Sequence, residues 1–443
     1  CYNSKMIITN LKKLAKTSLR KKALLIAEAA YEAIDIEKTI KRRIWIKKNI
    51  LEINIHLESS VLRLDLDDYN RVFMVGIGKG SALASVTLAK ILGKRLTGGI
   101  ALDVNQQKLE IKNFKFFKGD HPLPSKKNIK ATKEIIKLVY GLKKDDLLIN
   151  FICGSGSALV CSRDRELNYS KLIIKELTKA GAIISELNTV RKHLSDIKGG
   201  GLAKIAYPAT IVSLVASDVC GNDLSVVASG PTVFDKTTKK DAKKILKKYG
   251  LKPSKFALLE TPKDRKYFKN VKNILFVCNQ DGIMGMMAKA RKLGLKPKIH
   301  SLALEGEAKN ILLPMIKRVK KGEVILAAGE TTITFNKKIK PGKGGRNQEA
   351  VLGALVKLPI TNYQLQKNVV FLSFASDGYD HTESAGAIGD LIGLQKAQKI
   401  GLDARDYLNS HSTFKFFQKT NGALYTQKTC FNVADFMIVL RQS

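Results

Sequence analysis

Residues 71–81 read RVFMVGIGKGS, an apolar run of strand length that ends in a glycine-rich turn, and residues 82–92 continue as a helical stretch. The same order of strand, turn and helix recurs around 147–157, 211–218 and 369–378. Nearly continuous apolar strands that alternate with helices are typical of parallel sheets covered on both faces. The sequence therefore predicts an α/β protein with mostly parallel sheets. The turns should lie at the carboxyl edge of the strands, where such sheets bind ligands.

The remainder of the chain suggests two domains. Apolar residues at three-to-four spacing predict helix from about residue 11 to 57. Residues 235–255 are lysine-rich and lead into two prolines, so they are the best linker candidate, and a new strand is expected at 273–278. We therefore expect one domain over residues 1–255 and a second over 256–443.

Composition limits the class of protein. The 443 residues include 77 Lys and Arg against 39 Asp and Glu, a formal charge of +38, and 44% of the residues are hydrophobic. The lysines are spread along the chain, which favours a solvated surface over a nucleic-acid partner. The six cysteines form no Cys-x-x-Cys pair, which suggests free thiols and a cytoplasmic location. The apolar runs are too short to cross a membrane, so no membrane partner is expected.

Two glycine turns could hold phosphate. Gly78 and Lys79 follow the first strand, but their spacing matches neither a Walker A loop nor the dinucleotide fingerprint. A lysine just before a helix nevertheless suits a phosphate, because free backbone N–H groups at the helix start favour anions. The second turn offers further N–H groups and hydroxyls, from Gly154, Ser155, Gly156 and Ser157. A plain strand-to-helix turn remains an alternative for each.

Residues 342–349, GKGGRNQE, suggest another anion site at a helix start. Gly344 and Gly345 would let a ligand approach the backbone, and the Arg346 fork suits a carboxylate or a phosphate. An exposed turn before a helix is the alternative. Residues 188–201 also gather basic side chains before a glycine turn, which indicates either an anion pocket or a charged helix face.

Carboxylates follow two of the expected strands. Asp218 and Asp377 could hold Mg²⁺, or they could close Asx-turns and cap helices. Several anion sites together with carboxylates at strand ends are what phosphoryl transfer requires.

In combination these motifs resemble the glycerate 2-kinase family, whose C-terminal part is called the MOFRL domain. The resemblance runs from about residue 11 to 440. Its motifs, in order, are Gly78-Lys79, Gly119-Asp120-His121-Pro122-Leu123-Pro124, Gly156-Ser157-Ala158-Leu159, Asn188-Thr189-Val190-Arg191-Lys192-His193-Leu194-Ser195, Lys198-Gly199-Gly200, Ser217-Asp218-Val219, Ala228-Ser229-Gly230-Pro231-Thr232, Gly329-Glu330-Thr331-Thr332 and Gly344-Gly345-Arg346-Asn347-Gln348-Glu349.

The resemblance implies a Rossmann-like N-terminal domain and a MOFRL-type C-terminal domain, with the active site in the cleft between them. It implies transfer of the γ-phosphoryl group of ATP to the 2-hydroxyl of D-glycerate, with Mg²⁺. Lys79 and Arg346 match the active-site lysine and arginine of the family. The roles we assign are catalysis to Lys79, Arg346 and Asp218; phosphate binding to Gly78, Gly154, Ser155, Gly156, Ser157, Lys198, Gly344 and Gly345; substrate binding to Arg191, Glu330 and Asn347; and metal binding to Asp218 and Asp377.

The sequence departs from the family pattern at several places. Ser155 stands where the family usually has a third glycine. Residues 426–435 have lost both glycines of the family loop, and Ala434 replaces an asparagine. Two alternatives stay open. One is a hydroxypyruvate reductase, a label that the family has sometimes carried, although the dinucleotide fingerprint is missing. The other is a non-catalytic descendant that binds polyanions, which the charge of +38 and the altered loop suggest. The protein is expected to be a monomer or a homodimer.

Overall fold

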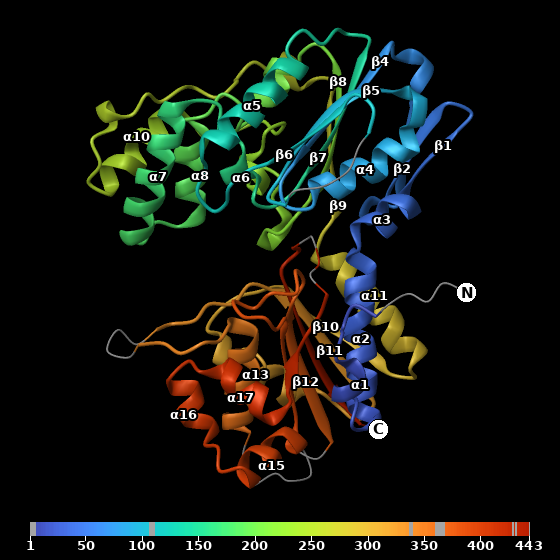
Figure 1. Cartoon of the computed structure of the whole chain (residues 1–443), viewed down its shortest axis with the longest axis vertical. Helices are drawn as coiled ribbons and strands as arrows, with labels where there is room; N and C mark the ends of the chain where they lie inside the picture. The colour runs from blue at the N-terminus through green and yellow to red at the C-terminus, as the bar shows by residue number, and fades with distance from the viewer. Residues whose placement is uncertain are drawn as a thin grey trace. The chain divides into compact units, whose positions relative to one another are not determined.

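The computed structural model of the chain describes residues 6–105, 111–335, 340–358, 368–427, 429 and 432–442. The chain forms two compact units (Figure 1). Residues Ile36–Val277 are called the Rossmann-like unit, and Cys1–Asp35 together with Cys278–Ser443 are called the C-terminal unit. This division differs from the one expected at residue 255. The chain's first segment packs with its last, and the Rossmann-like unit continues to the end of its sixth parallel strand.

The Rossmann-like unit is built on a six-stranded parallel sheet, as predicted. Its strand order, β6-β5-β4-β7-β8-β9, is the 3-2-1-4-5-6 order of doubly wound nucleotide-binding folds. The point where the order reverses lies between β4 and β7. The strands are β4 (Arg71–Ile77), β5 (Leu96–Asp103), β6 (Phe114–Lys118), β7 (Asp146–Ile152), β8 (Thr210–Ala216) and β9 (Val271–Val277).

Helices cover both faces of this sheet, and Figure 1 shows α4 and α5 on opposite faces. Their apolar sides bury a core that includes Val75, Ile135 and Leu148. The helices are α3 (Ile36–Arg43), α4 (Ser81–Leu92), α5 (Lys126–Val139), α6 (Gly156–Leu159), α7 (Asp164–Lys179), α8 (Ile184–Lys192), α9 (Gly201–Ala206) and α10 (Lys239–Lys248).

Two expectations for this unit were wrong. Residues 44–55 are not helical, because β1 (Ile44–Lys47), β2 (Ile50–Ile55) and β3 (Ser60–Asp65) form a small antiparallel sheet. The alternating burial of β2 is the period-two pattern of a strand. Residues 235–255 are not a linker either. They contain α10, whose start is closed by a capping box of Thr238 and Asp241 and whose Ala242 and Leu246 are buried.

The C-terminal unit has a six-stranded sheet in the order β10-β11-β15-β12-β13-β14. Among the described strand pairs, β10–β11 is parallel and the other four are antiparallel, so the expectation of a mostly parallel sheet does not hold here. The reason is that β15 returns between β11 and β12. The strands are β10 (Lys296–Leu304), β11 (Glu323–Gly329), β12 (Val369–Ala375), β13 (Gly386–Gly389), β14 (Ala423–Leu424) and β15 (Asp435–Arg441).

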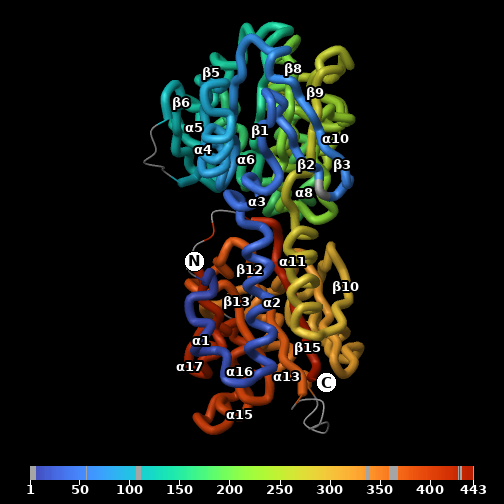
Figure 2. Tube along the Cα trace, turned by 90° about the vertical axis from the view of Figure 1, so that its right-hand side faces the viewer, coloured from blue at the N-terminus to red at the C-terminus, as the bar shows by residue number. Residues whose placement is uncertain are grey.

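Helices α2 and α11 run side by side on one face of this sheet, and α13 covers the other (Figure 2). A buried ion pair between Arg20 and Asp390, 2.5 Å apart, joins α2 to the start of α15. The helices are α1 (Leu11–Leu14), α2 (Ser18–Ile34), α11 (Asn279–Lys292), α12 (Leu313–Arg318), α13 (Arg346–Lys357), α15 (Leu391–Lys399), α16 (Ala404–Asn409) and α17 (Thr413–Thr420). Within the described ranges, no helix combines the length and the apolar character needed to span a bilayer.

Candidate active site

The two predicted phosphate turns meet in the Rossmann-like unit, because β4 and β7 are neighbours in the sheet. The backbone N–H of Lys79 donates to the carbonyl oxygen of Gly154 over 2.9 Å. Gly78 has φ +115°, and a Cβ at this position would overlap the carbonyl oxygen of Cys153. Only glycine accepts both conditions, so Gly78 lets the turn that carries Lys79 lie against the turn after β7.

Asp218 lies at the same edge, at the end of β8. Its carboxylate is packed so closely on the backbone of Gly154 that any Cβ there would overlap Oδ2. Gly154 is therefore required for contact with the protein's own carboxylate. The turn thus combines backbone N–H groups, a lysine and a carboxylate, the elements that phosphoryl transfer uses.

Ser157 has a partner that the sequence analysis did not assign. Its Oγ lies 2.8 Å from Oγ of Ser229, at the end of the short helix η5 (Val227–Ser229). Ser229 and its neighbour Ala228 have φ of +60° and +50°, and this left-handed bend brings the hydroxyl to the turn. Ser155 is also left-handed, with φ +68°. That conformation explains why the family prefers glycine there.

Asp103, at the end of β5, holds the Lys79 turn and was also missed. Its Oδ2 accepts hydrogen bonds of 3.0 Å from the backbone N–H groups of Gly80 and Ala82. Burial raises the pKa of this carboxyl, although the hydrogen bonds oppose the shift. The carboxylate of Asp103 thus accepts from the backbone N–H groups at the start of α4, and it fixes the backbone of the turn that contains Lys79.

In the basic segment 188–201, three of the four basic side chains have partners within the protein. Lys192 pairs with Asp235, His193 with Thr189 and Glu260, and Lys198 with Glu166. Lys198 is 2% exposed and lies 2.8 Å from Glu166, so the expected contact of Lys198 with phosphate is not supported. The half-buried guanidinium of Arg191 has no hydrogen-bond or ion-pair partner among the described residues. Burial lowers the pKa of Arg191 to about 10, so it is still a cation at neutral pH.

In the C-terminal unit Arg346 is held by two carboxylates. Its Nε lies 2.5 Å from Oδ2 of Asp435, and its Nη1 lies 2.5 Å from Oε1 of Glu330. Burial by itself would lower the pKa of Arg346, but these two charges outweigh it and raise the pKa. The sequence predicts a role for Glu330 but not for Asp435. Asp435 is brought to this site by the pairing of β15 with β11, which the sequence does not reveal.

The glycines before α13 serve the fold. A Cβ on Gly345 would overlap Asp380, and one on Gly344 would overlap the hydroxyl of Thr413. Asp380 accepts hydrogen bonds from the backbone N–H groups of Asn347 (3.1 Å) and Gln348 (2.9 Å). The anion at this helix start is a carboxylate of the protein, in place of the ligand anion that the sequence predicts. Phosphate binding by Gly344 and Gly345 is therefore not supported.

The side chain of Asn347 is likewise engaged by other residues of the protein, so the expected contact of Asn347 with substrate is not supported. It is 1% exposed and accepts a 2.6 Å hydrogen bond from Ser373 while its amide donates to Asp380. Asp377 accepts from the backbone N–H of Tyr379 over 3.0 Å, which is the Asx-turn alternative. The altered loop 426–435 lies partly outside the described residues, namely at 428, 430 and 431.

The described ranges contain no group of three His, Cys, Asp or Glu arranged to hold a metal. A magnesium ion bound with ATP needs less, because it is held by one or two carboxylates together with the phosphates and water. Asp218 fits that requirement, since its carboxylate lies against Gly154 in the turn at residues 154–157, which is called the phosphate turn below. Four of the six cysteines, Cys153, Cys161, Cys220 and Cys278, are not in disulfides, as expected.

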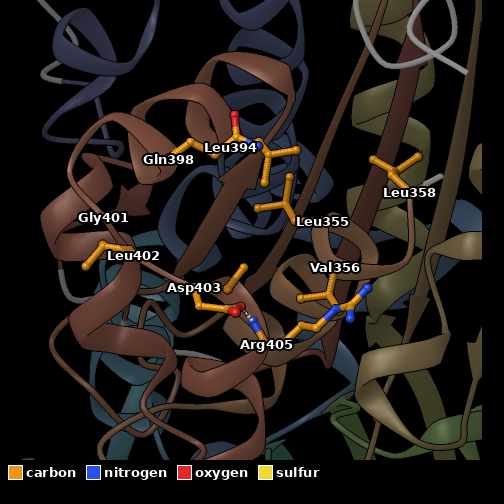
Figure 3. A pocket seen from close by; sticks show the side chains of 10 residues that line it. Leu355, Val356, Leu358, Leu394, Gln398, Gly401, Leu402, Asp403 and Arg405 are labelled. Carbon is orange, nitrogen blue, oxygen red and sulfur yellow. Dashed lines mark hydrogen bonds between the residues drawn. The ribbon is translucent and has the colours of Figure 1, made fainter. Parts of the chain in front are cut away.

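A pocket of about 570 Å³ lies elsewhere, in the C-terminal unit (Figure 3). Leu355 and Val356 of α13, Leu394 of α15 and Leu402 give it mainly apolar walls. Asp403 in its wall already accepts the backbone N–H of Arg405 over 2.7 Å. None of the residues assigned above to catalysis or binding lines this pocket.

Comparisons with known proteins show similarity over most of the chain. Residues 22–259 match a family described as a domain of unknown function (DUF4147), and residues 323–435 match the MOFRL family. D-glycerate 2-kinase from Thermotoga maritima is 31% identical, over 96% of this chain and 98% of its own length. A protein from Agrobacterium vitis with a provisional name as a hydroxypyruvate reductase is 34% identical, over 84% of this chain and 87% of its own length.

A crystal structure of glycerate kinase from Thermotoga maritima superposes with a TM-score of 0.83 at 30% identity, covering 96% of this chain and 99% of that one. The similarity extends across both units. The resemblance read from the motifs is confirmed, and this chain belongs to the glycerate 2-kinase family.

Proposed function

We propose that this protein is an ATP-dependent kinase that transfers the γ-phosphoryl group of ATP to the 2-hydroxyl of D-glycerate. The observation that carries the proposal is the junction of three strand ends in the Rossmann-like unit. There Lys79, the turn at residues 154–157 and Asp218 adjoin one another. Phosphoryl transfer depends on positioning and charge neutralisation, and this junction supplies both.

Each residue of the junction has a proposed task. Lys79 neutralises charge on the phosphoryl group that moves, and the backbone N–H groups and Ser157 position the phosphates. Asp218 accepts the proton of the substrate hydroxyl or holds Mg²⁺. Bound magnesium would neutralise phosphate charge. In the C-terminal unit, Arg346 is assigned to the glycerate carboxylate or the phosphates, and Glu330 orients it. Asp377 remains a second candidate for the metal.

The last part of the proposal concerns the location and the oligomeric state of the protein. Free thiols support a reducing, cytoplasmic location. We also propose that the protein is a monomer or a homodimer.

The test is an ADP-release assay with Mg-ATP and D-glycerate, with the phosphorylated carbon identified by NMR. We expect 2-phosphoglycerate, and a large loss of kcat/KM in Lys79→Ala. Lys90→Ala is the matched control, because Lys90 is exposed at the end of α4. Full activity in Lys79→Ala would overturn the assignment of that lysine. ADP release without 2-phosphoglycerate would refute the proposed acceptor, and NADH oxidation with hydroxypyruvate would identify the reductase instead.

A further inference from the structure

We propose that His121 is a further substrate-binding residue, which receives the carboxylate of D-glycerate together with Arg191. This inference rests on the proposed function, since it names the residues of that same site that recognise the acceptor. His121 lies in the loop after β6, at the carboxyl edge of the parallel sheet. It is exposed, and so accessible to a ligand.

The loop of His121 is fixed to the Lys79 turn on one side. The backbone N–H of Gly119 donates to the carbonyl oxygen of Asp103 over 2.8 Å. The carboxylate of the same Asp103 holds Gly80 and Ala82, the residues that follow Lys79. The histidine loop and the lysine turn therefore share one anchor.

Asn128 fixes the loop to the phosphate turn on the other side. This side chain is fully buried, and its Oδ1 accepts the backbone N–H of Asp120 over 3.0 Å. Its amide donates to the carbonyl oxygens of Asp120 (3.1 Å) and Leu159 (3.1 Å). Leu159 ends α6, the helix that starts at Gly156. Asn128 is thus a positioning residue that sets the distance between the two loops.

Arg191 reaches the same place from α8. This helix packs against η5, whose Ser229 is bonded to Ser157 of the phosphate turn. The pKa of His121 is lowered by partial burial of the ring and by the charges of Lys79 and Arg191. The histidine is therefore mainly neutral near pH 7 and can donate one N–H without displacing a proton. Two cations lie around an accessible histidine, and one of them, Arg191, has no hydrogen-bond or ion-pair partner within the described part of the chain; together they form a site for a small anion. The fork of Arg191 favours a planar carboxylate.

The test compares His121→Asn with His300→Asn, a matched change on the edge strand β10 of the other unit. We expect His121→Asn to raise KM for D-glycerate by about tenfold or more and to leave KM for ATP nearly unchanged. His300→Asn should behave like the wild type. A rise in KM for ATP in place of KM for D-glycerate would show that the anion is a nucleotide phosphate, and would overturn the inference. Unchanged KM for both substrates would also overturn it.

A second measurement does not depend on turnover. An anion beside an imidazole favours its protonated form, so D-glycerate should raise the pKa of His121. By linkage, D-glycerate should bind more tightly as the pH falls between the free and the bound pKa of His121. We would follow the ring carbons of labelled histidine by NMR, with and without D-glycerate and in the absence of ATP. An unmoved His121 titration in a protein that still phosphorylates D-glycerate refutes this inference alone. No turnover by the wild type refutes the proposed function.

Discussion

Arg346 and Asp435 form an ion pair in which Nε and Oδ2 lie 2.5 Å apart. Arg346 is the first residue of α13 and Asp435 the first of β15, so the pair joins a helix start to a strand start in the C-terminal unit. Asp435 is 1% exposed, whereas the Arg346 side chain is 20% exposed. The carboxylate is thus buried behind the guanidinium, which leaves part of the arginine accessible to a ligand.

The geometry of Arg346 predicts that lysine cannot replace it. Two different nitrogens of the guanidinium contact Asp435 and Glu330, and a single ammonium cannot reproduce that fork. We expect Arg346→Lys to reduce kcat/KM by about 100-fold or more, measured in the ADP-release assay. Arg405→Lys, an exposed arginine of the same unit, is the control and should keep wild-type activity. Equal activity of the two variants would mean that Arg346 acts only as a point charge.

The buried carboxyl of Asp435 predicts a pH-dependent stability. Burial raises the pKa of Asp435 to about 7, although Arg346 opposes the shift. An unfolded Asp has a pKa of about 3.9, so between these two pH values the folded state binds more protons than the unfolded state. The stability contributed by this group is therefore present at low pH and falls as the pH rises towards about 7.

Asp435→Asn removes that titration. We expect the Tm of the wild type, relative to that of Asp435→Asn, to fall between about pH 5 and about pH 8. Differential scanning calorimetry of both proteins in the same buffers gives the answer. A constant difference in Tm across this range would show that Asp435 has the same pKa in the folded and unfolded states.

The contacts of Asp435 also show where sequence reasoning reached its limit. Lys79, Gly154 and Asp218 could be predicted because apolar runs reveal strand ends, and neighbouring parallel strands bring those ends together. Asp435 could not, because its partner depends on β15 entering the sheet between β11 and β12. That position is set by long-range pairing, and nothing in the local pattern of residues 435–441 reveals it.

Arg191 and Lys198 illustrate the same limit for charge. Both stand in one basic segment, and the sequence treats them alike. Their difference comes from Glu166, a carboxylate 32 residues from Lys198 along the chain, which neutralises Lys198 inside the core. The structure offers no such partner to Arg191 among its described residues. A basic motif thus predicts charge, but the packing of other elements decides whether that charge is available.

The buried pair of Lys198 and Glu166 predicts a loss of stability with little loss of chemistry. Removing one partner of a buried ion pair leaves an unpaired charge and costs about 3–5 kcal/mol, whereas replacing both by apolar residues is often tolerated. We expect Lys198→Met to lower the Tm strongly and the double variant Lys198→Met, Glu166→Leu to recover most of it. The double variant, where it is folded, should keep a KM for ATP close to that of the wild type. A large rise in KM for ATP in that folded protein would restore the original phosphate-binding assignment.

The backbone of Ala434, beside Asp435, predicts an unusual response to glycine. Ala434 is buried with φ +87°, a left-handed conformation that costs a residue with a Cβ about 1–2 kcal/mol. Ala434→Gly removes that cost, and the extra freedom of glycine in the unfolded chain cancels part of the gain. We expect a net stabilisation of up to about 1 kcal/mol, measured by urea unfolding.

Ala385→Gly is the matched control, because Ala385 is equally buried but lies outside the left-handed region. It should lose stability. If both glycine variants lose stability to the same extent, then Ala434 carries no strain, and its replacement of the family's asparagine has no cost for the fold.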